Sequence, residues 1–459
     1  MTESAIAIAM RNPDGHETYA EHGNAILEHE VPASASTVFN VGSVAKQITA
    51  YLAIRMHHAR VLDLGANIRR YLPRVQIDDV TVGELITHTA GFRDAETLLS
   101  LCGYRDLDHY TADDLLNLAY RQQARAVPRE QFLYSNTHYL LLAKLLEITC
   151  GTPLARLAAD EIFTPLGMAD TQFIDDQRTL ILHAAASYEN SNGQVRKATR
   201  PVALAGPGSL WTSTRDLMRW LLNLHQLWVS GESEHLPFGE VFAYVPADRA
   251  EFAYGPGLYA TSKPAQSVFH NGHEHGFSAS TILGRDGAAI LCVANASWTP
   301  AERLISEIRR LAVPPQCASD ALRIALERGT PISARERETQ PSTRRSESGD
   351  TQLGVFAASD VPGRVQLLKI GKDLALVRRG TRDLLTPLGT TGKAFCGPGF
   401  VLTLDPATGD GDAISSFMLD LDRAPRIRYT RLAADLTSSP HVERDAELAI
   451  SRPTAPGAS

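Results

Sequence analysis

The sequence predicts an α+β fold: an antiparallel sheet flanked by helices, an all-helical region inserted between its strands, and a small β-barrel after it. Three observations lead to this prediction. Apolar and polar residues alternate over residues 4–40 and again over 257–296, as in strands with one buried face. The region between them carries helical patterns instead. Beyond a polar stretch, short alternating segments return over residues 365–431.

Strands and one helix are expected at the start of the chain. Turn signals at residues 12–15 (Asn-Pro-Asp-Gly) and 21–24 (Glu-His-Gly-Asn) separate two or three strands. A helix is expected over residues 44–60, because apolar residues recur there at helical spacing. These residues are Val44, Ile48, Leu52 and Met56.

Residues 60 to about 250 are expected to be mainly helical. Two helices are predicted at 112–124 and 137–150, and the second ends before Gly151. Strands are then expected at residues 257–259, 267–273, 277–284 and 288–296. A helix should follow, beginning with the capping box Thr299-Pro300-Ala301-Glu302 and running to about Leu311. This order places the functional site where the sheet meets the helical region.

The length of 459 residues predicts two domains. We expect the larger, chemistry-bearing domain at residues 1–329 and a linker at 330–349, which is polar, charged and nearly free of large apolar residues. A β-barrel is expected at 350–437 and a flexible tail at 438–459. The barrel strands are predicted at residues 365–369, 374–378, 384–387, 400–404, 414–419 and 427–431.

Composition narrows the class of protein. Hydrophobic residues make up 44% of the chain, and the net charge of −7 argues against binding to nucleic acid or to an anionic membrane. No stretch is long and apolar enough to span a bilayer, so a soluble protein is expected. The five cysteines are dispersed and lack Cys-x-x-Cys spacing, which favours neither disulfides nor a zinc site. The start, Met-Thr-Glu-Ser, has no basic region or cleavage site, which predicts a cytoplasmic location.

The first motif is Ser43-Val44-Ala45-Lys46. A serine hydroxyl is a poor nucleophile until a neighbouring base takes its proton. If Ser43 opens a helix, Lys46 lies on the same face and its amine can reach the hydroxyl. The alternative is that Ser43 only caps a core helix.

The second motif is Tyr134-Ser135-Asn136. Tyr134 is a candidate general acid or base that moves protons between Ser43, leaving group and water. Asn136 is a candidate to hydrogen-bond Lys46 and the substrate amide. The alternative is a turn in which Asn136 simply caps the following helix.

The third motif, His270-Asn271-Gly272, lies in a predicted strand. Such a strand can pair with an extended substrate backbone, and Gly272 would let the substrate approach closely. The backbone amides of Ser43 and His273 are candidate oxyanion-hole donors. His270 is a candidate to position the other groups and the substrate; the alternative is an ordinary buried or surface histidine.

In this order the motifs resemble those of the penicillin-recognising serine hydrolases, specifically the branch with class C β-lactamases, D-amino-acid-specific peptidases and related esterases. The resemblance covers roughly residues 5–315. Further segments similar to that branch are Leu85 to Gly91, Phe163 to Met168, Gly206 to Leu210, Thr212 to Leu217 and Tyr254 to Gly257. Within the resemblance His88 is structural, and residues 350–437 resemble the lipocalin-like domain of some of these enzymes.

The resemblance implies a serine β-lactamase/DD-peptidase-like fold and a serine hydrolase that acts through an acyl-enzyme. Its implied catalytic residues are Ser43, Lys46 and Tyr134, without metal or organic cofactor. The substrate would be a small amide or short peptide, with a D-residue as one option, ahead of an ester and a β-lactam. The alternatives are an acyltransferase and a non-catalytic sensor that becomes acylated.

Two features leave further interpretations open. The loop after the third motif is usually glycine-rich, but here it reads His273-Glu274-His275, which makes a metal site conceivable, although a role in shaping the cleft mouth is favoured. The barrel would stabilise the protein or form a homodimer, or else extend a loop into the cleft to restrict substrates.

Overall fold

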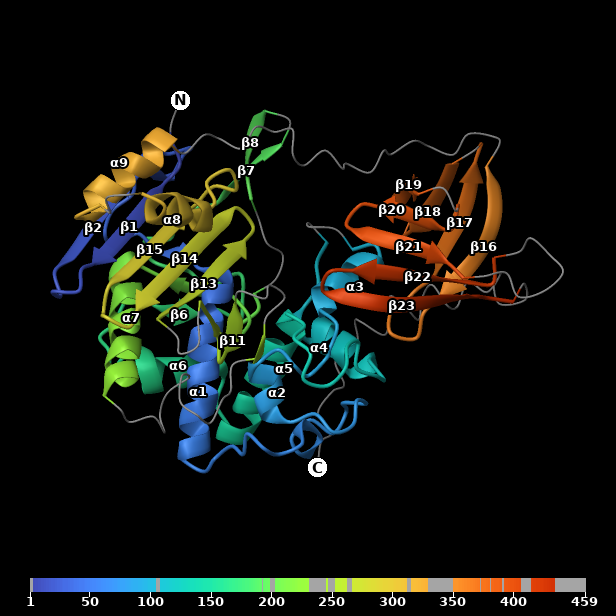
Figure 1. Cartoon of the computed structure of the whole chain (residues 1–459), viewed down its shortest axis with the longest axis horizontal. Coiled ribbons are helices and arrows are strands. Elements are labelled where there is room, and N and C mark those ends of the chain that lie inside the picture. The colour runs from blue at the N-terminus through green and yellow to red at the C-terminus, as the bar shows by residue number, and fades with distance from the viewer. Residues whose placement is uncertain are drawn as a thin grey trace.

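The computed structural model has two parts, a sheet with helices on both faces and a separate barrel (Figure 1). It describes residues 3–104, 108–191, 193–198, 203–230, 245–246, 252–261, 266–311, 315–328, 350–371, 373–379, 381–389, 392–405 and 414–433. The predicted linker at 330–349 and tail at 438–459 lie outside the described residues.

The main sheet has eight strands in the order β10-β11-β12-β13-β14-β15-β1-β2. Its strands are β1 (Ile6–Arg11), β2 (Glu17–His22), β10 (Val245–Pro246), β11 (Ala253–Gly255), β12 (Leu258–Ala260), β13 (Ser267–Glu274), β14 (Phe277–Gly284) and β15 (Ala289–Ala294). All neighbours pair antiparallel, and β1 pairs with β15 from Ile6↔Ala294 to Arg11↔Ala289. The N-terminal strands therefore complete a sheet whose other strands come some 240 residues later. The prediction of an antiparallel sheet is confirmed.

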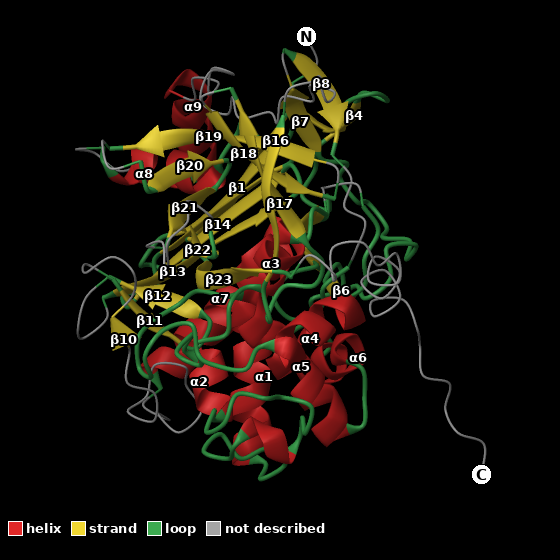
Figure 2. Ribbon diagram, turned by 90° about the vertical axis from the view of Figure 1, so that its right-hand side faces the viewer, coloured by secondary structure: helices red, strands yellow, loops and turns green. Residues whose placement is uncertain are grey.

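Successive side chains of β1 point to opposite faces of the sheet, and each face is covered by different helices. Ala7 and Ala9 belong to the large core shared with the helical region. Ile6 and Ile8 pack instead in a second core with α8 (Ala301–Arg309) and α9 (Ala318–Arg328). Figure 1 shows these two helices on one face and the larger helical region on the other. A 90° turn shows the strands above and most helices below (Figure 2).

The helical region lies between β5 (Phe39–Asn40) and β10. It comprises α1 (Lys46–His58), α2 (Val82–Ile86), α3 (Ala95–Leu101), α4 (Ala112–Arg121), α5 (Asn136–Cys150), α6 (Leu154–Ala158) and α7 (Thr214–Val229), with the short strands β6 (Gln172–Phe173), β7 (Tyr188–Ser191), β8 (Gln194–Lys197) and β9 (Leu210–Thr212). α5 ends as expected, because Gly151 adopts the left-handed conformation with φ of 64°. α4 stops three residues short of the prediction because Gln122 is extended, and its side chain binds the backbone N–H and C=O of Arg93 at 2.8 and 3.0 Å.

The predicted capping box at the start of α8 is wrong. The helix begins at Ala301 after Pro300, and no side chain caps it from the N-cap position. The amide of Ala301 donates instead to Oγ of Ser278 on β14, at 2.8 Å. The carboxylate of Glu302 is therefore free to bind the side chains of Ser278 and His273 rather than the helix terminus.

The C-terminal part is a closed barrel of eight antiparallel strands in sequence order. The strands are β16 (Thr351–Ala357), β17 (Val365–Ile370), β18 (Asp373–Arg378), β19 (Thr381–Leu388), β20 (Ala394–Gly397), β21 (Phe400–Leu404), β22 (Ser416–Leu421) and β23 (Ala424–Arg431). Six of them were predicted from their alternation; β16 and β20 were not. Figure 1 shows the barrel beside α3 and α4.

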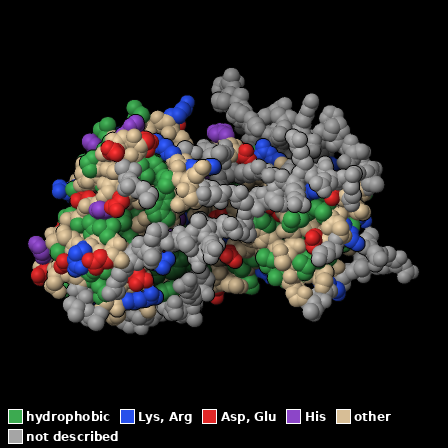
Figure 3. Space-filling model, turned by 90° about the horizontal axis from the view of Figure 1, so that it is seen from above, with side chains coloured by type: hydrophobic (Ala, Val, Ile, Leu, Met, Phe, Trp, Pro, Cys, Tyr) green, Lys and Arg blue, Asp and Glu red, His purple; other side chains and the backbone are tan. Residues whose placement is uncertain are grey.

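Seen from above, acidic and basic side chains are interspersed over the sheet-bearing part of the molecule (Figure 3). Among the described residues, none of the helices has the length and apolar character needed to cross a bilayer.

Candidate active site

Ser43 lies in a 3₁₀ turn, η1 (Gly42–Ala45), that leads directly into α1. The turn is sharp because Gly42 has φ of 50°, and the side chain of Asn40 accepts a hydrogen bond from the Gly42 amide at 2.9 Å. Lys46 follows as the first residue of α1. Ser43 and Lys46 thus share one face of the helix start, as the spacing predicts.

The Lys46 side chain is completely buried and its amine has three oxygen neighbours. Nζ lies 2.9 Å from Oγ of Ser43, 2.8 Å from Oδ1 of Asn136 and 2.7 Å from the carbonyl oxygen of Pro207. The last two atoms are hydrogen-bond acceptors only. They take two N–H bonds and leave the third direction at Nζ toward the serine hydroxyl.

Burial lowers the pKa of Lys46 below its usual 10.5, and the charge of Arg423 lowers it further, while Tyr134 opposes the shift. Desolvation disfavours the charged ammonium, so burial shifts the equilibrium toward the neutral amine. A neutral amine has a lone pair that can accept the serine proton.

Asn136 is held from the backbone and from the side chain. Its amide N–H donates to Oδ2 of Asp94 at 2.7 Å, and its Nδ2 donates to Oε2 of Glu96 at 2.8 Å. These contacts turn Oδ1 toward Lys46. Asn136 is the first residue of α5, not its cap, and the N-cap residue Ser135 makes no capping bond, so the alternative of a simple helix cap does not hold.

The Tyr134 ring lies 5.0 Å from Nζ of Lys46, measured to the ring centre. It packs against the ring of His88, with centroids 4.4 Å apart, and lies 6.3 Å from the ring of His270. His88 is completely buried, and its main-chain oxygen accepts from the amide of Leu133 at 2.8 Å. This histidine supports the Tyr134 segment.

β13 presents an open edge to the Ser43 turn. Among the described residues, β12 pairs with β13 only at Val268 and Phe269. Beyond that point an added Cβ on Gly272 would lie 1.9 Å from the carbonyl oxygen of Val41 and 3.1 Å from the amide of Ser43. An added Cβ on Gly42 would lie 2.8 Å from the amide nitrogen of His273. Two glycines thus let the backbone of the Ser43 turn and the backbone at His273 approach each other closely.

His270 points from β13 toward the aromatic side of the site. It is 2% exposed, and its Nε2 lies 3.5 Å from the Tyr254 hydroxyl. Burial, helped by the charge of Lys46, lowers the pKa of His270 to about 3. The ring is therefore neutral near pH 7, with Nδ1 donating to the carbonyl oxygen of Asn271 at 2.6 Å.

The side chains of His273 and Glu274 lie on opposite faces of β13, and Nε2 of His273 pairs with Glu302 of α8 at 3.1 Å. They do not converge, and in the described part of the chain no group of three His, Cys, Asp or Glu side chains could hold a metal ion. The His273 side chain is thus directed to α8.

Four supporting residues escaped the sequence analysis: Asp94, Glu96, His138 and Arg423. The first two orient Asn136, and His138 contacts His88. Arg423 comes from the barrel, and its guanidinium carbon lies 5.0 Å from the Tyr134 ring centre. None belongs to a local motif, because each reaches the site through tertiary packing.

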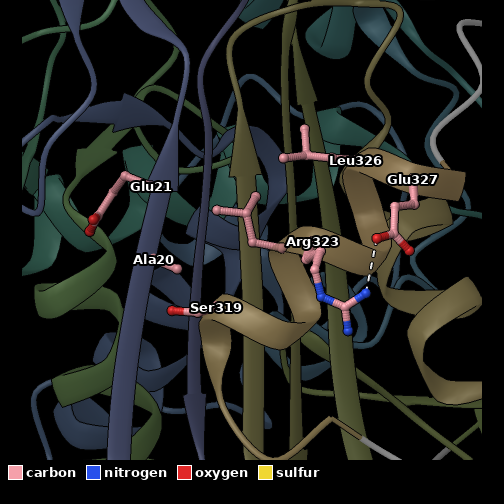
Figure 4. A pocket seen from close by; sticks show the side chains of 7 residues that line it. Ala20, Glu21, Ser319, Arg323, Leu326 and Glu327 are labelled. Atoms are coloured by element: carbon pink, nitrogen blue, oxygen red, sulfur yellow. Dashed lines mark hydrogen bonds and ion pairs between the residues drawn. The ribbon is translucent and has the colours of Figure 1, made fainter.

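A pocket of about 610 Å³ lies elsewhere, between β2 and α9 (Figure 4). Its lining includes Glu21 and Arg323, and Arg323 pairs with Glu327 at 2.9 Å. None of the residues described around Ser43 lines it.

Comparison with known proteins matches residues 7–312 to the β-lactamase family. A penicillin-binding protein of Bacillus subtilis (strain 168) is 23% identical over 279 residues, which are 57% of this chain and 61% of that protein. A D-aminopeptidase of Brucella canis is 25% identical over 228 residues, 47% of this chain and 43% of that protein. The chain thus spans between about two fifths and three fifths of these relatives. The fold is similar to a D-stereospecific amidohydrolase from Streptomyces sp., with a TM-score of 0.57, 19% identity and coverage of 68% of this chain and 95% of that one.

Proposed function

This chain belongs to the β-lactamase family, and we propose that it is a serine hydrolase that cleaves a small amide or peptide through an ester on Ser43. The observation that carries the proposal is the set of three oxygens around Lys46 Nζ. It supports a neutral amine aimed at the hydroxyl, which is the arrangement that serine activation requires.

In the proposed first step the Ser43 hydroxyl gives its proton to Nζ of Lys46, and Oγ attacks the substrate carbonyl carbon. The oxygen of the tetrahedral intermediate takes negative charge and accepts from the amides of Ser43 and His273. The proton passes from Lys46 through the Tyr134 hydroxyl to the leaving nitrogen, and the C–N bond breaks. Asn136 keeps the amine in place.

In the second step water attacks the ester carbon. The water proton goes to the Tyr134 oxygen as the hydroxyl proton of Tyr134 moves to the neutral amine of Lys46. Lys46 then gives a proton to Oγ of Ser43 as the C–O bond breaks. The neutral His270 lines the aromatic side of this path and positions Tyr134 and the substrate.

An amide or peptide with a D-residue is the favoured substrate class. The support is the similarity to a D-aminopeptidase and to the fold of a D-stereospecific amidohydrolase. Because the same acyl-enzyme serves esters, these come second.

The test combines intact-mass spectrometry with turnover of D- and L-aminoacyl amides, p-nitrophenyl esters and a chromogenic cephalosporin, using wild type and Ser43→Ala. We expect hydrolysis of a D-aminoacyl amide that Ser43→Ala abolishes. Ser36→Ala, at an exposed serine of the preceding loop, is the matched control and should keep full activity. Turnover that survives in Ser43→Ala refutes the mechanism, and a stable adduct without turnover favours an acyltransferase or a sensor.

A further inference from the structure

The tight turn between β22 and β23 reaches from the barrel to the site around Ser43. Leu421 pairs with Ala424, so Asp422 and Arg423 form the tip of a two-residue hairpin. The backbone amide of Asp94 donates to the carbonyl oxygen of Arg423 at 2.9 Å. Asp94 in turn holds Asn136, so the barrel turn is one hydrogen bond away from the residues that orient Lys46.

A buried arginine fixes the base of this hairpin. Arg93 is 7% exposed and donates to the carbonyl oxygens of Pro425 and Arg426 at 2.8 and 3.0 Å. It also pairs with Asp360 of the barrel at 3.0 Å. From the other side, Nε of Arg426 donates to the carbonyl oxygen of Ala126 at 3.1 Å. The turn is therefore anchored from both parts of the molecule.

The guanidinium of Arg423 lies over the Tyr134 ring, and its charge also acts on the buried carboxylate of Asp94. Within the described residues no carboxylate forms an ion pair with it, whereas the barrel residues Arg378 and Arg428 pair with carboxylates at 2.6 and 2.5 Å. The carboxylates of Asp94 and Glu96 each accept a hydrogen bond from Asn136. Arg423 remains exposed to solvent.

We propose that Arg423 is a specificity-determining residue that binds a carboxylate of the substrate, on the leaving-group side of the bond that Ser43 attacks. This inference rests on the proposed function, because Tyr134 is the residue that protonates the leaving nitrogen there. A guanidinium presents a planar pair of donors that matches a carboxylate. The favoured substrates are therefore short peptides with a free C-terminal carboxylate rather than simple amides.

The decisive comparison uses two ligands that differ only in charge: alanylglycine and alanylglycinamide, each with D- or L-alanine. Binding is measured by calorimetry on Ser43→Ala protein, which cannot turn the ligand over. We expect the acid of the preferred stereoisomer to bind about tenfold more tightly than its amide. Adding Arg423→Gln should remove that preference, and Arg423→Lys should retain part of it.

Arg428→Gln is the matched control, since it removes the same charge from the same hairpin away from Tyr134 and should leave the preference intact. Equal binding of acid and amide, absence of binding by either at millimolar concentration, or a preference that survives Arg423→Gln would overturn the inference. Failure of the proposed function is separate: Ser43→Ala protein would keep the acid preference in binding, while the wild-type protein would show no Ser43-dependent hydrolysis.

Discussion

Nδ1 of His88 lies 2.9 Å from Nδ1 of His138, both rings are completely buried, and the His88 ring packs against Tyr134. The amide of Phe92 donates to Nε2 of His138 at 3.1 Å. The neutral His138 must then carry its proton on Nδ1 and donate it to His88. The pair is satisfied only while both rings are neutral, since two protonated nitrogens would face one another.

Stability should therefore fall on acidification. Burial is the main cause that lowers the pKa of His88 well below 6.5 and the pKa values of His138 and His270 to about 3. On acidification the unfolded chain binds these protons at a higher pH than the folded chain does. The contribution of the three neutral histidines to the free energy of unfolding is therefore intact above pH 6.5 and is lost as the pH falls toward 3. Each histidine adds a slope of roughly 1.4 kcal/mol per pH unit. Denaturant unfolding between pH 7 and 4.5 measures the total.

Replacing one of these histidines tests the assignment. His270→Gln should reduce the slope by about 1.4 kcal/mol per pH unit. His16→Gln, at an exposed histidine, should leave it unchanged. If the two variants and wild type share one slope, the buried rings are not the cause.

The rate of Ser43 acylation should rise with pH through the ionisation of Lys46. Burial lowers the pKa of Lys46 and so raises the share of neutral amine at a given pH, whereas an arginine at this position cannot lose its proton. Lys46→Arg should slow labelling by an uncharged fluorophosphonate by about 100-fold or more and remove the pH-dependent rise. Lys144→Arg, on the half-exposed side of α5, is the control. Labelling by Lys46→Arg within tenfold of wild type at all pH values would exclude Lys46 as the base.

Local patterns predicted the parts of the molecule that local chemistry determines. β13 and β14 were predicted nearly to their ends because alternation reports burial on one face. The capping box failed because Ser278, from a neighbouring strand, satisfies the first amide of α8. Arg423 is separated from Tyr134 by 289 residues, and nothing in its own turn indicates the contact. Ser43, Lys46 and Asn136 were brought together as their motifs predicted, but their support from Asp94 and Glu96 depends on tertiary packing.

Gly272→Ala should disable the site through the backbone. The added methyl would lie 1.9 Å from the carbonyl oxygen of Val41, so β13 and the Ser43 turn must separate. We expect kcat to fall by about 100-fold or more, since the two proposed oxyanion donors lose their spacing, and stability to fall by about 1–3 kcal/mol. Gly65→Ala, where the nearest atom to the new Cβ is 3.4 Å away, should affect neither. Normal turnover by Gly272→Ala would argue against an oxyanion hole at this edge.

Removing the anchor of the barrel turn should affect substrate choice before it affects serine reactivity. Arg93→Ala leaves Asp360 and the carbonyl oxygens of Pro425 and Arg426 without their partner, so the hairpin loses its base. Breaking a buried ion pair from one side costs about 3–5 kcal/mol, and hydrogen exchange in the β22–β23 turn should rise accordingly. Labelling of Ser43 by an uncharged fluorophosphonate should stay within about threefold of wild type, because Lys46 and Asn136 keep their own contacts. The preference for an acid over its amide should decline as in Arg423→Gln.

Asp360→Asn tests whether the ion pair alone is responsible: it removes the charge but keeps an acceptor for Arg93, so it should produce a smaller loss of the same kind. An unchanged acid preference in Arg93→Ala, together with faster exchange in the turn, would mean that Arg423 does not depend on this anchor.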